Sequence, residues 1–354
     1  MTAGQPQRTE SARKSNGETG KWAHTYAALD LGTNNCRLLV ARPTRDGFRV
    51  VDSFSRIVRL GEGVSRSGLL SGAAQRRTID ALSVCVAKMR RQKASRMRSV
   101  ATEACRRASN CDRFIDRVAA ETGLDLEIIS SAEEARLALA GCAPLLGDAC
   151  DHALVFDIGG GSTELMWLNV PAAGEPWAES CMSIPCGVVT FAERYGGGRM
   201  PEETYRAIVE RVAELIAPFE ARHRIRERVA AGAVQMLGTS GTVTTLAAVS
   251  LGLSRYDRSA VDGTYLTFDD VADLSRRLAR MEEAERAANP CIGHARADLV
   301  VAGCAILEAI CRAWPVGRLR VADRGVREGI LLGLIGAADA EAEAAAPAAA
   351  IGSP

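Results

Sequence analysis

The sequence LVFDIGGGSTEL at residues 154–165 carries more information about this chain than any other stretch of its length. An apolar run with β-branched and aromatic side chains ends at Asp157, and three glycines and two hydroxyl residues follow before apolar residues resume at Leu165. This order predicts a β-hairpin with a glycine-rich turn. Residues 159–161 are expected to take positive φ values and to turn their N–H groups toward a ligand. Such a turn suits a phosphate, with the Asp157 carboxylate beside it free to hold a cation or a water.

A weaker copy of this pattern lies near the beginning of the chain. Residues 26–41 read YAALDLGTNNCRLLVA, which is again a short apolar strand, an acid at Asp30, a glycine, hydroxyl and amide side chains, and a second strand. Asp before Gly is also common in ordinary turns, so turn formation is the alternative role for Asp30. Two copies of one device predict two hairpins that face a phosphate, one in each half of the chain.

The composition is that of a soluble globular protein with room for two domains. The 354 residues are 47% hydrophobic and 25% charged, and the mean hydropathy is −0.01. The net charge of +1 argues against a nucleic-acid binder held by bulk charge. No apolar run approaches the roughly 20 residues needed to span a membrane. The 11 cysteines include no C-x-x-C pair, which indicates buried thiols in a reducing cytoplasm rather than a metal framework.

Apolar periodicity predicts a mixed sheet covered by helices in each half of the chain. In the first half we expect, after the hairpin, a strand at 49–60, a helix at 71–93, a strand at 98–102, a helix reaching to 119, a strand at 126–130 and a helix at 132–140. In the second half we expect strands at 153–158, 163–169 and 179–184, a helix at 201–222, a strand at 233–237, a helix from 242, a helix at 298–313, a strand at 319–322 and a helix at 325–335. A duplicated unit of this kind normally places its ligand in the cleft between the copies.

Five segments, in order and spacing, closely resemble the exopolyphosphatase / guanosine pentaphosphate phosphatase family. They read YAALDLGTNNCRLLVA, ATEACRRASN, IISSAEEARLAL, LVFDIGGGSTEL and LGTSGTVTTLAAV, and the resemblance covers residues 25–336. It implies an α/β fold of two similar ribonuclease H-like domains, as in the actin-like ATPase superfamily, with the active site in the interdomain cleft. The E-E-A-R segment separates this family from its kinase relatives.

The resemblance and the element order together give the expected domain limits. Domain I, with the first hairpin, is expected over residues 23–145, and domain II, with the second hairpin, over residues 146–322. The helix at 323–336 is expected to return to domain I, as family members suggest. Residues 1–22 and the Ala-rich and Glu-rich residues 337–354 are expected to be disordered tails. The chain resembles the short form without the C-terminal helical domain of longer members, so limited processivity on long chains is expected.

The resemblance implies that Glu134 activates the attacking water, because it matches the second Glu of the family's E-E-A segment. From spacing alone, Glu133 and Glu134 would be acids that stabilise the first turn of a helix capped by a preceding serine. That structural interpretation is kept for Glu133. A general base of this kind is what hydrolysis of a terminal phosphoanhydride requires.

Asp157 is expected to be the second catalytic acid, holding a metal or the attacking water, and Asp30 is expected to face it from the other hairpin. Two carboxylates that converge on a phosphate would repel it unless a cation intervenes. Mg²⁺ or another divalent cation, held by Asp30 and Asp157, is therefore implied.

The remaining expected site residues bind phosphate through backbone N–H groups, amide or hydroxyl side chains, or a guanidinium. Arg106 matches the phosphate-contacting arginine of the family's A-T-x-A-x-R segment, and the loop at 238–241 joins a strand to a helix N-terminus. The full set is Thr33, Asn34, Asn35, Arg106, Gly159, Gly160, Gly161, Ser162, Gly238, Thr239, Ser240 and Gly241. Asn35 stands where the family usually has Ser and Cys36 where it has an apolar residue, which bears on fine substrate preference. The basic run at 88–98 is interpreted as a solvated helix end rather than as a guide for a polyanion.

The expected function is that of a cytoplasmic exopolyphosphatase, which releases orthophosphate from the end of inorganic polyphosphate. One alternative keeps the chemistry and changes the substrate to the 5′-phosphate of guanosine pentaphosphate (pppGpp), the nucleotide of the stringent response. A kinase of the same superfamily is a second alternative, against which the E-E-A-R segment weighs. A third is a regulatory module that binds polyphosphate or nucleotide without turnover, and the presence of both Glu134 and Asp157 weighs against it. The resemblance also allows a homodimer.

Overall fold

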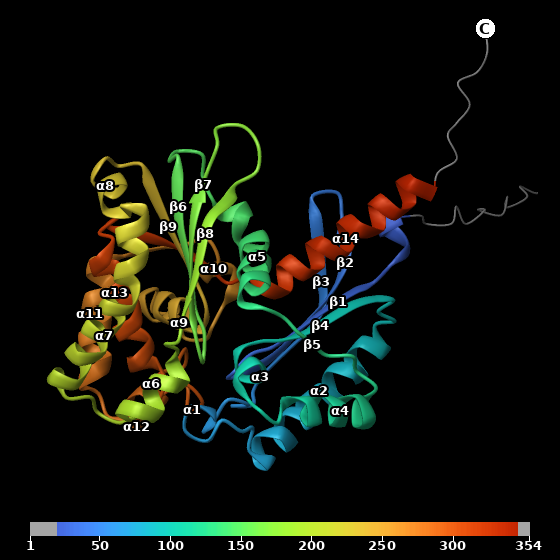
Figure 1. The fold of residues 1–354 in the computed structure, drawn as a ribbon, viewed down its shortest axis with the longest axis horizontal. Coiled ribbons are helices and arrows are strands. Elements are labelled where there is room, and N and C mark those ends of the chain that lie inside the picture. Colours follow the sequence, from blue (N-terminus) through green and yellow to red (C-terminus); the bar gives the residue numbers. More distant parts are fainter. Residues whose placement is uncertain (1–19, 346–354) are drawn as a thin grey trace, which may run out of the picture.

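A computed structural model describes residues 20–345 of the chain and shows two α/β domains side by side (Figure 1). The elements up to the crossing between the domains are η1 (Gly20–Ala23), β1 (Tyr26–Leu31), β2 (Asn35–Thr44), β3 (Gly47–Ile57), α1 (Val64–Ser67), α2 (Gly72–Arg91), β4 (Arg96–Ala101), α3 (Glu103–Arg107), α4 (Cys111–Thr122), β5 (Glu127–Ile128), α5 (Ser131–Cys142) and η2 (Ala143–Leu145). Those that follow are β6 (His152–Ile158), β7 (Thr163–Asn169), β8 (Trp177–Ile184), α6 (Val188–Tyr195), α7 (Glu202–His223), α8 (Ile225–Ala230), β9 (Val234–Thr239), α9 (Gly241–Ser250), α10 (Arg258–Val261), β10 (Tyr265–Thr267), α11 (Phe268–Arg280), α12 (Glu283–Ala287), α13 (Val300–Ala313), β11 (Arg318–Ala322) and α14 (Val326–Ala345).

The two sheets repeat one strand order and one pattern of directions. The first sheet has the order β3-β2-β1-β4-β5, with β1 antiparallel to β2 and parallel to β4. Read from the corresponding edge, the second has the order β8-β7-β6-β9-β11-β10, with β6 antiparallel to β7 and parallel to β9. In the second sheet β10 adds an antiparallel edge strand to β11. The predicted fold of two similar α/β domains is confirmed.

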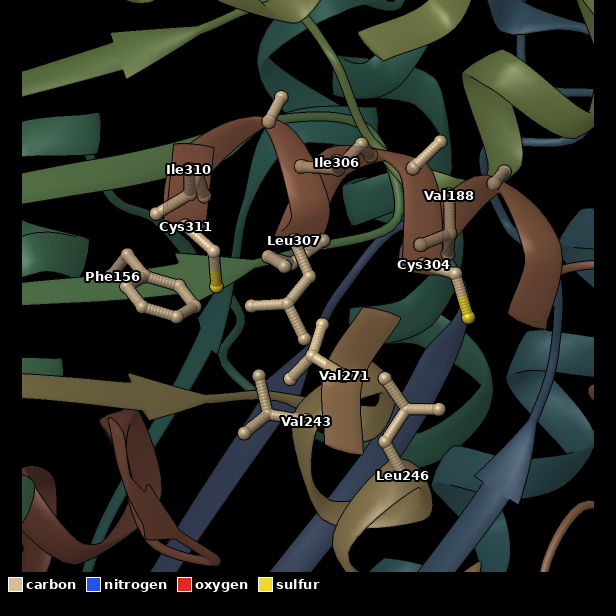
Figure 2. Close-up of a cluster of buried hydrophobic side chains, with 14 of the residues drawn as sticks. Phe156, Val188, Val243, Leu246, Val271, Cys304, Ile306, Leu307, Ile310 and Cys311 are labelled. Atoms are coloured by element: carbon tan, nitrogen blue, oxygen red, sulfur yellow. The ribbon is translucent and has the colours of Figure 1, made fainter. Parts of the chain in front are cut away.

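The centre of the second sheet is buried, and this burial positions its hairpin. β6 reads HALVFDI, a nearly continuous apolar run of the kind that suits a strand covered on both faces. Figure 2 shows part of the cover: Leu307 of α13 lies toward Val243 of α9, and Cys311 of α13 lies beside Phe156 of β6. Because Phe156 is held in this core, the neighbouring Asp157 is held at the end of the strand.

A separate apolar layer lies between the two sheets, where α5 packs against α14. The two helices cross at close range on glycines. A Cβ added at Gly329 would lie 2.0 Å from the carbonyl oxygen of Leu137, and one added at Gly141 would lie 2.1 Å from that of Gly325. α14 also contacts β1 and β2. The crossing therefore ties α5, which carries Glu134, to the first sheet.

The prediction of a disordered tail from residue 337 is wrong for residues 337–345, which continue α14. Alanine and glutamate are strong helix formers, and the last turns have partners. Ala338 is buried, and Asp339 lies 3.0 Å from Nζ of Lys21 in the short helix η1. Residues 20–22, which were predicted to belong to the disordered N-terminal tail, are thus part of the fold. Residues 1–19 and 346–354, for which disorder was also predicted, lie outside the described residues.

Other differences concern elements with weak or overlooked signals. The strand predicted at 126–130 is reduced to Glu127–Ile128. No element was predicted at 251–297, where the structure has α10, β10, α11 and α12, although Val271, Leu274 and Leu278 of α11 have helical spacing. Among residues 20–345, no helix combines the length and the apolar character that crossing a membrane requires.

Candidate active site

A pocket lies in the cleft where the two hairpin turns and the N-terminus of α9 meet. Its wall includes most of the residues predicted for the site, together with Arg37, Glu103 and Arg296, which were not predicted. The predicted residues on the wall are Asp30, Thr33, Asn34, Asn35, Glu134, Asp157, Gly159, Gly160, Gly161, Ser162, Ser240 and Gly241. Both halves of the chain thus contribute to one pocket.

The glycines of the second hairpin allow the two turns to touch. A Cβ added at Gly160 would lie 3.0 Å from Cβ of Thr33 and 3.2 Å from the backbone nitrogen of Asn34, and one added at Gly161 would lie 2.9 Å from Oγ1 of Thr33. None of the three glycines at 159–161 has a positive φ, so the prediction of left-handed backbone here is wrong. What requires glycine is the close approach of the first hairpin.

Two acids face each other across the second hairpin. Asp157 and Glu164 are directly opposed in the antiparallel pair of β6 and β7, and Glu164 accepts hydrogen bonds from the hydroxyls of Ser162 at 2.6 Å and Ser183 at 2.9 Å. Glu164 was not predicted as a site residue. The signal was present, because a turn over residues 159–162 brings residue 164 opposite residue 157. In the first hairpin the corresponding pair is Asp30 and Arg37.

The acids of the cleft hold protons more tightly than exposed carboxyls do. Burial, followed by the charge of Glu164, raises the pKa of Glu134 to about 8. Burial, followed by the charge of Glu134, raises the pKa of Asp157 to about 7, and burial with the charge of Asp157 raises the pKa of Glu164 to about 7. Burial also raises the pKa of Asp30, against the opposing effect of Arg37. Burial is thus the main cause of each shift, and the mutual repulsion of Glu134, Asp157 and Glu164 adds to it.

Arg106 contacts carboxylates and does not lie on the pocket wall. Its guanidinium donates to Oε2 of Glu134 at 2.8 Å, to the carbonyl oxygen of Ile129 at 3.0 Å and to Oε2 of Glu103 at 2.9 Å. In this arrangement the hydrogen bonds of the Arg106 guanidinium go to Glu134, Glu103 and the carbonyl oxygen of Ile129. Glu133, by contrast, pairs with Arg98 and Arg136 on the surface, at 2.9 and 2.7 Å.

Of the loop at 238–241, which was predicted to bind phosphate, the first two residues contact other parts of the protein and the last two line the pocket. A Cβ added at Gly238 would lie 2.5 Å from the ring of Phe156, so this glycine is required by the core. Thr239 donates its hydroxyl to the carbonyl oxygen of Arg324 at 2.7 Å. Ser240 has a φ of 113°, in the region that glycine favours, and its Oγ accepts from the backbone of Thr242 at the start of α9. Of the four predicted residues, Ser240 and Gly241 line the pocket.

The donor set of the pocket suits a hard cation, although no complete metal cage is present. Within residues 20–345, no three Asp, Glu, His or Cys side chains are arranged to hold a metal ion. Asp30 and Asp157 nevertheless place carboxylates on the pocket wall, and the buried Oδ1 atoms of Asn34 and Asn35 have no hydrogen-bond partner among the described residues. Mg²⁺ is commonly held by one or two carboxylates together with substrate oxygens and water, so these residues fit the ion.

Known proteins share this architecture along nearly the whole chain. The model of the Ppx/GppA phosphatase family matches residues 39–338. A Mycobacterium tuberculosis protein named Exopolyphosphatase 2 is 31% identical over 331 residues, which cover 88% of this chain and 98% of that protein. The crystal structure of an exopolyphosphatase-like protein matches with a TM-score of 0.80 and 28% identity, over 88% of this chain and 97% of the other. The crystal structure of the Aquifex aeolicus member of the Ppx/GppA family matches with a TM-score of 0.70 and 27% identity, over 89% and 98% of the two chains.

Proposed function

This chain belongs to the Ppx/GppA phosphatase family, and from that premise we propose that it is an exopolyphosphatase, which releases orthophosphate from the end of inorganic polyphosphate. The observation that carries the proposal is the placement of Glu134, Asp157 and Glu164 beside two hairpin turns that touch each other. The name of the Mycobacterium tuberculosis relative supports the choice of substrate.

In the proposed reaction the terminal phosphate lies against the turns at 32–35 and 159–162, whose N–H groups and hydroxyls contact its oxygens. Glu134 takes a proton from a water as the water oxygen forms a bond to the terminal phosphorus. The bond from that phosphorus to the bridging oxygen breaks, and the bridging oxygen stays with the shortened chain. Arg106 holds the Glu134 carboxylate in place during this step, through its 2.8 Å hydrogen bond.

Asp30 and Asp157, with Glu164 beside them, would hold Mg²⁺. When bound, the ion supplies positive charge that offsets the repulsion between these carboxylates and the phosphate oxygens. Burial first, and then the charge of a neighbouring acid, raises the pKa values of Asp157 and Glu164 to about 7, and a bound cation would offset that repulsion between the acids.

The proposal is tested by phosphate release from long-chain polyphosphate and from pppGpp, each with Mg²⁺, by the wild type and by Glu134→Gln. We expect polyphosphate turnover by the wild type and a loss of about 10²–10⁴-fold in kcat in the variant, which is the usual contribution of a general base. Arg211→Gln is the control, because Arg211 pairs with Glu214 on the exposed face of α7. Faster turnover of pppGpp than of polyphosphate would show that pppGpp is the preferred substrate. If the folded wild type released phosphate from neither substrate, the proposal that this protein is a phosphatase acting on them would be wrong.

A further inference from the structure

The turn of the first hairpin is contacted on its outer side by the segment that follows β3. This segment, residues 58–65, is called the first brace. Its backbone N–H groups donate to the carbonyl oxygen of Asn34 from Arg59 at 3.0 Å and to that of Thr33 from Gly61 at 2.9 Å. A Cβ added at Gly61 would lie 2.3 Å from Cγ2 of Thr33, so the two segments are in contact. A displacement of the first brace therefore displaces the turn.

The turn of the second hairpin is held in a similar way by residues 186–193, which are called the second brace and include most of α6. The backbone N–H of Val188 donates to the carbonyl oxygen of Gly159 at 3.0 Å. A Cβ added at Gly187 would lie 2.4 Å from the carbonyl carbon of Gly160, so this brace also packs directly on its turn. Each of the two turns is thus supported by a brace from its own domain.

Glu193 joins the two braces across the boundary between the domains. Its Oε1 accepts from the backbone N–H of Gly63 at 2.7 Å, and its Oε2 accepts from the hydroxyl of Ser65 at 2.9 Å. Glu193 lies in the last turn of α6, whereas Gly63 and Ser65 lie at the start of α1, which is close to α6 in Figure 1. Both oxygens of this half-buried carboxylate therefore bind the opposite domain.

The start of α1 offers donors that suit a carboxylate. Gly63 precedes the first residue of α1 and, as a glycine, has no side chain that could cap the helix. Its φ is 78°, in the region that favours glycine. A carboxylate forms stronger hydrogen bonds with such N–H and O–H donors than a neutral acceptor does. Glu193 thus supplies from the second domain the acceptor that a capping side chain would supply from within α1.

We propose that Glu193 is a positioning residue that fixes the spacing between the two hairpin turns. The inference rests on the proposed function, and it adds a residue that is not on the wall of the pocket. A continuous series of contacts runs from the second turn through the second brace, Glu193 and the first brace to the first turn. Without Glu193 the two braces move independently. The terminal phosphate then loses contacts with one of the turns, and displacements of this kind are costly in an active site.

The ion pair of Arg59 and Asp298 also joins the domains, at 2.8 Å, but it lacks this connection to the second turn. Asp298 belongs to the loop that precedes α13 and lies outside the second brace. Removing that pair is expected to weaken closure of the cleft and so to affect KM. Removing Glu193 is expected to disturb the groups that contact the phosphate in the transition state and so to affect kcat.

The kinetic test measures kcat and KM for polyphosphate with Mg²⁺, using the full chain as wild type and as Glu193→Ala. We expect kcat to fall by roughly 10- to 100-fold, as for a displacement of up to about 1 Å in an active site, and KM to change by less than about twofold. Glu214→Ala is the matched control, because Glu214 pairs with Arg211 on the exposed face of α7. A raised KM with an unchanged kcat would show that Glu193 only closes the cleft, and would overturn the proposal.

Ser65→Ala tests the same link from the first domain. It removes one of the two hydrogen bonds of Glu193, so kcat should fall by less than in Glu193→Ala. The double variant should have the kcat of Glu193→Ala alone, because the two side chains act through one contact. Additive losses would overturn the proposal. If Glu193→Ala does not fold, Ser65→Ala still decides the question, since an unchanged kcat in that variant also overturns it.

Hydrogen exchange of the backbone amides, measured without substrate, tests the link independently of activity. In Glu193→Ala, exchange should become faster both in peptides of the first brace, including Gly61, and in peptides of the second brace, including Val188. Glu214→Ala should leave both unchanged. If the wild type releases phosphate from neither polyphosphate nor pppGpp, the proposed function fails, and exchange still decides on the link. Faster exchange in both braces supports it, whereas faster exchange in neither or in one alone overturns it.

Discussion

Nη1 of Arg106 donates a hydrogen bond of 2.8 Å to Oε2 of Glu134, and so joins α3 to the carboxylate on the first turn of α5. The same guanidinium holds Glu103 and the carbonyl oxygen of Ile129. Arg106 thus contacts the proposed general base and is not on the wall of the pocket. Its charge also opposes the rise in the pKa of Glu134 that burial and Glu164 cause.

Arg106→Gln should therefore lower kcat and move the pH profile. Loss of the hydrogen bond frees the Glu134 carboxylate, which costs up to about 10²-fold in kcat. Loss of the positive charge raises the pKa of Glu134 further, so the midpoint of the rising limb of kcat/KM should move to higher pH. The neighbouring Arg107→Gln is the control, because Arg107 reaches Glu103 only at 4.0 Å. A lower kcat with an unmoved midpoint would contradict the electrostatic part of this account.

The protein without Mg²⁺ should lose stability as the pH rises from about 4 to about 8. Burial, followed by the charge of Glu134, raises the pKa of Asp157 to about 7, so the folded state keeps a proton that the unfolded chain has lost. The stability due to that proton is present at low pH and is lost as the pH rises through 7. Asp157→Asn should flatten the curve of melting temperature against pH, whereas Asp273→Asn, at an exposed position of α11, should not. A melting temperature that rises over this range would oppose the assignment.

Gly160→Ala should separate the two hairpins and lower activity. The new Cβ would lie 3.0 Å from Cβ of Thr33, a side chain fixed in the facing turn. A displacement of the phosphate-facing turns by a few tenths of an ångström to 1 Å can cost about 10²-fold in kcat/KM. Gly198→Ala is the matched control, since nothing lies within 4 Å of its added Cβ. Equal activity of the two variants would show that close contact between the turns is not needed.

Asp298→Ala should weaken closure of the cleft. Asp298 accepts from both terminal nitrogens of Arg59, at 2.8 and 3.0 Å, and these residues belong to opposite domains. Because the ion pair is partly exposed, we expect it to contribute about 1 kcal/mol to closure of the cleft. Its loss should raise KM roughly fivefold. The radius of gyration of the protein without ligand, from small-angle X-ray scattering, should increase. Glu214→Ala, which removes an exposed ion pair within α7, should change neither the KM nor the radius of gyration. Additive effects of Asp298→Ala and Arg59→Ala on KM would show that the ion pair between these residues does not contribute.

Local patterns were sufficient for the parts of the site that lie on one hairpin or one helix turn. The spacing of apolar residues, acid and glycines around Asp157 predicted a hairpin, and the structure has β6 and β7 there. Ser130 does cap α5, since its Oγ accepts from the backbone of Glu133 at 3.1 Å. Glu164 could also have been predicted, because the register of a short hairpin follows from the length of its turn. The first turn of α5 and both hairpin turns need only neighbouring residues to form.

Contacts between segments distant in the sequence were not predictable in this way. The closeness of Arg106 to Glu134 depends on where α3 and α5 lie on the first sheet, and Arg296 comes from a loop without a sequence signal. Gly238 belongs to a loop whose sequence suits a phosphate site, yet glycine is required there because the ring of Phe156 leaves no room for a Cβ. The continuation of α14 beyond residue 336 depends on partners near the opposite end of the chain, such as Lys21.

The two hairpins, the acids at their strand ends and the duplicated α/β order could be predicted from the sequence, because they follow from side-chain alternation and turn chemistry within a few residues. Which of the charged side chains have a partner of opposite charge depends on the tertiary structure. Arg258 and Arg324 each lie within 4.0 Å of a carboxylate, whereas Arg37 and Arg296, which line the pocket, have none within that distance among the described residues. The physical reason is that the energy of a charge depends on burial and on neighbours within a few ångströms, and folding brings those neighbours from segments far apart in the sequence.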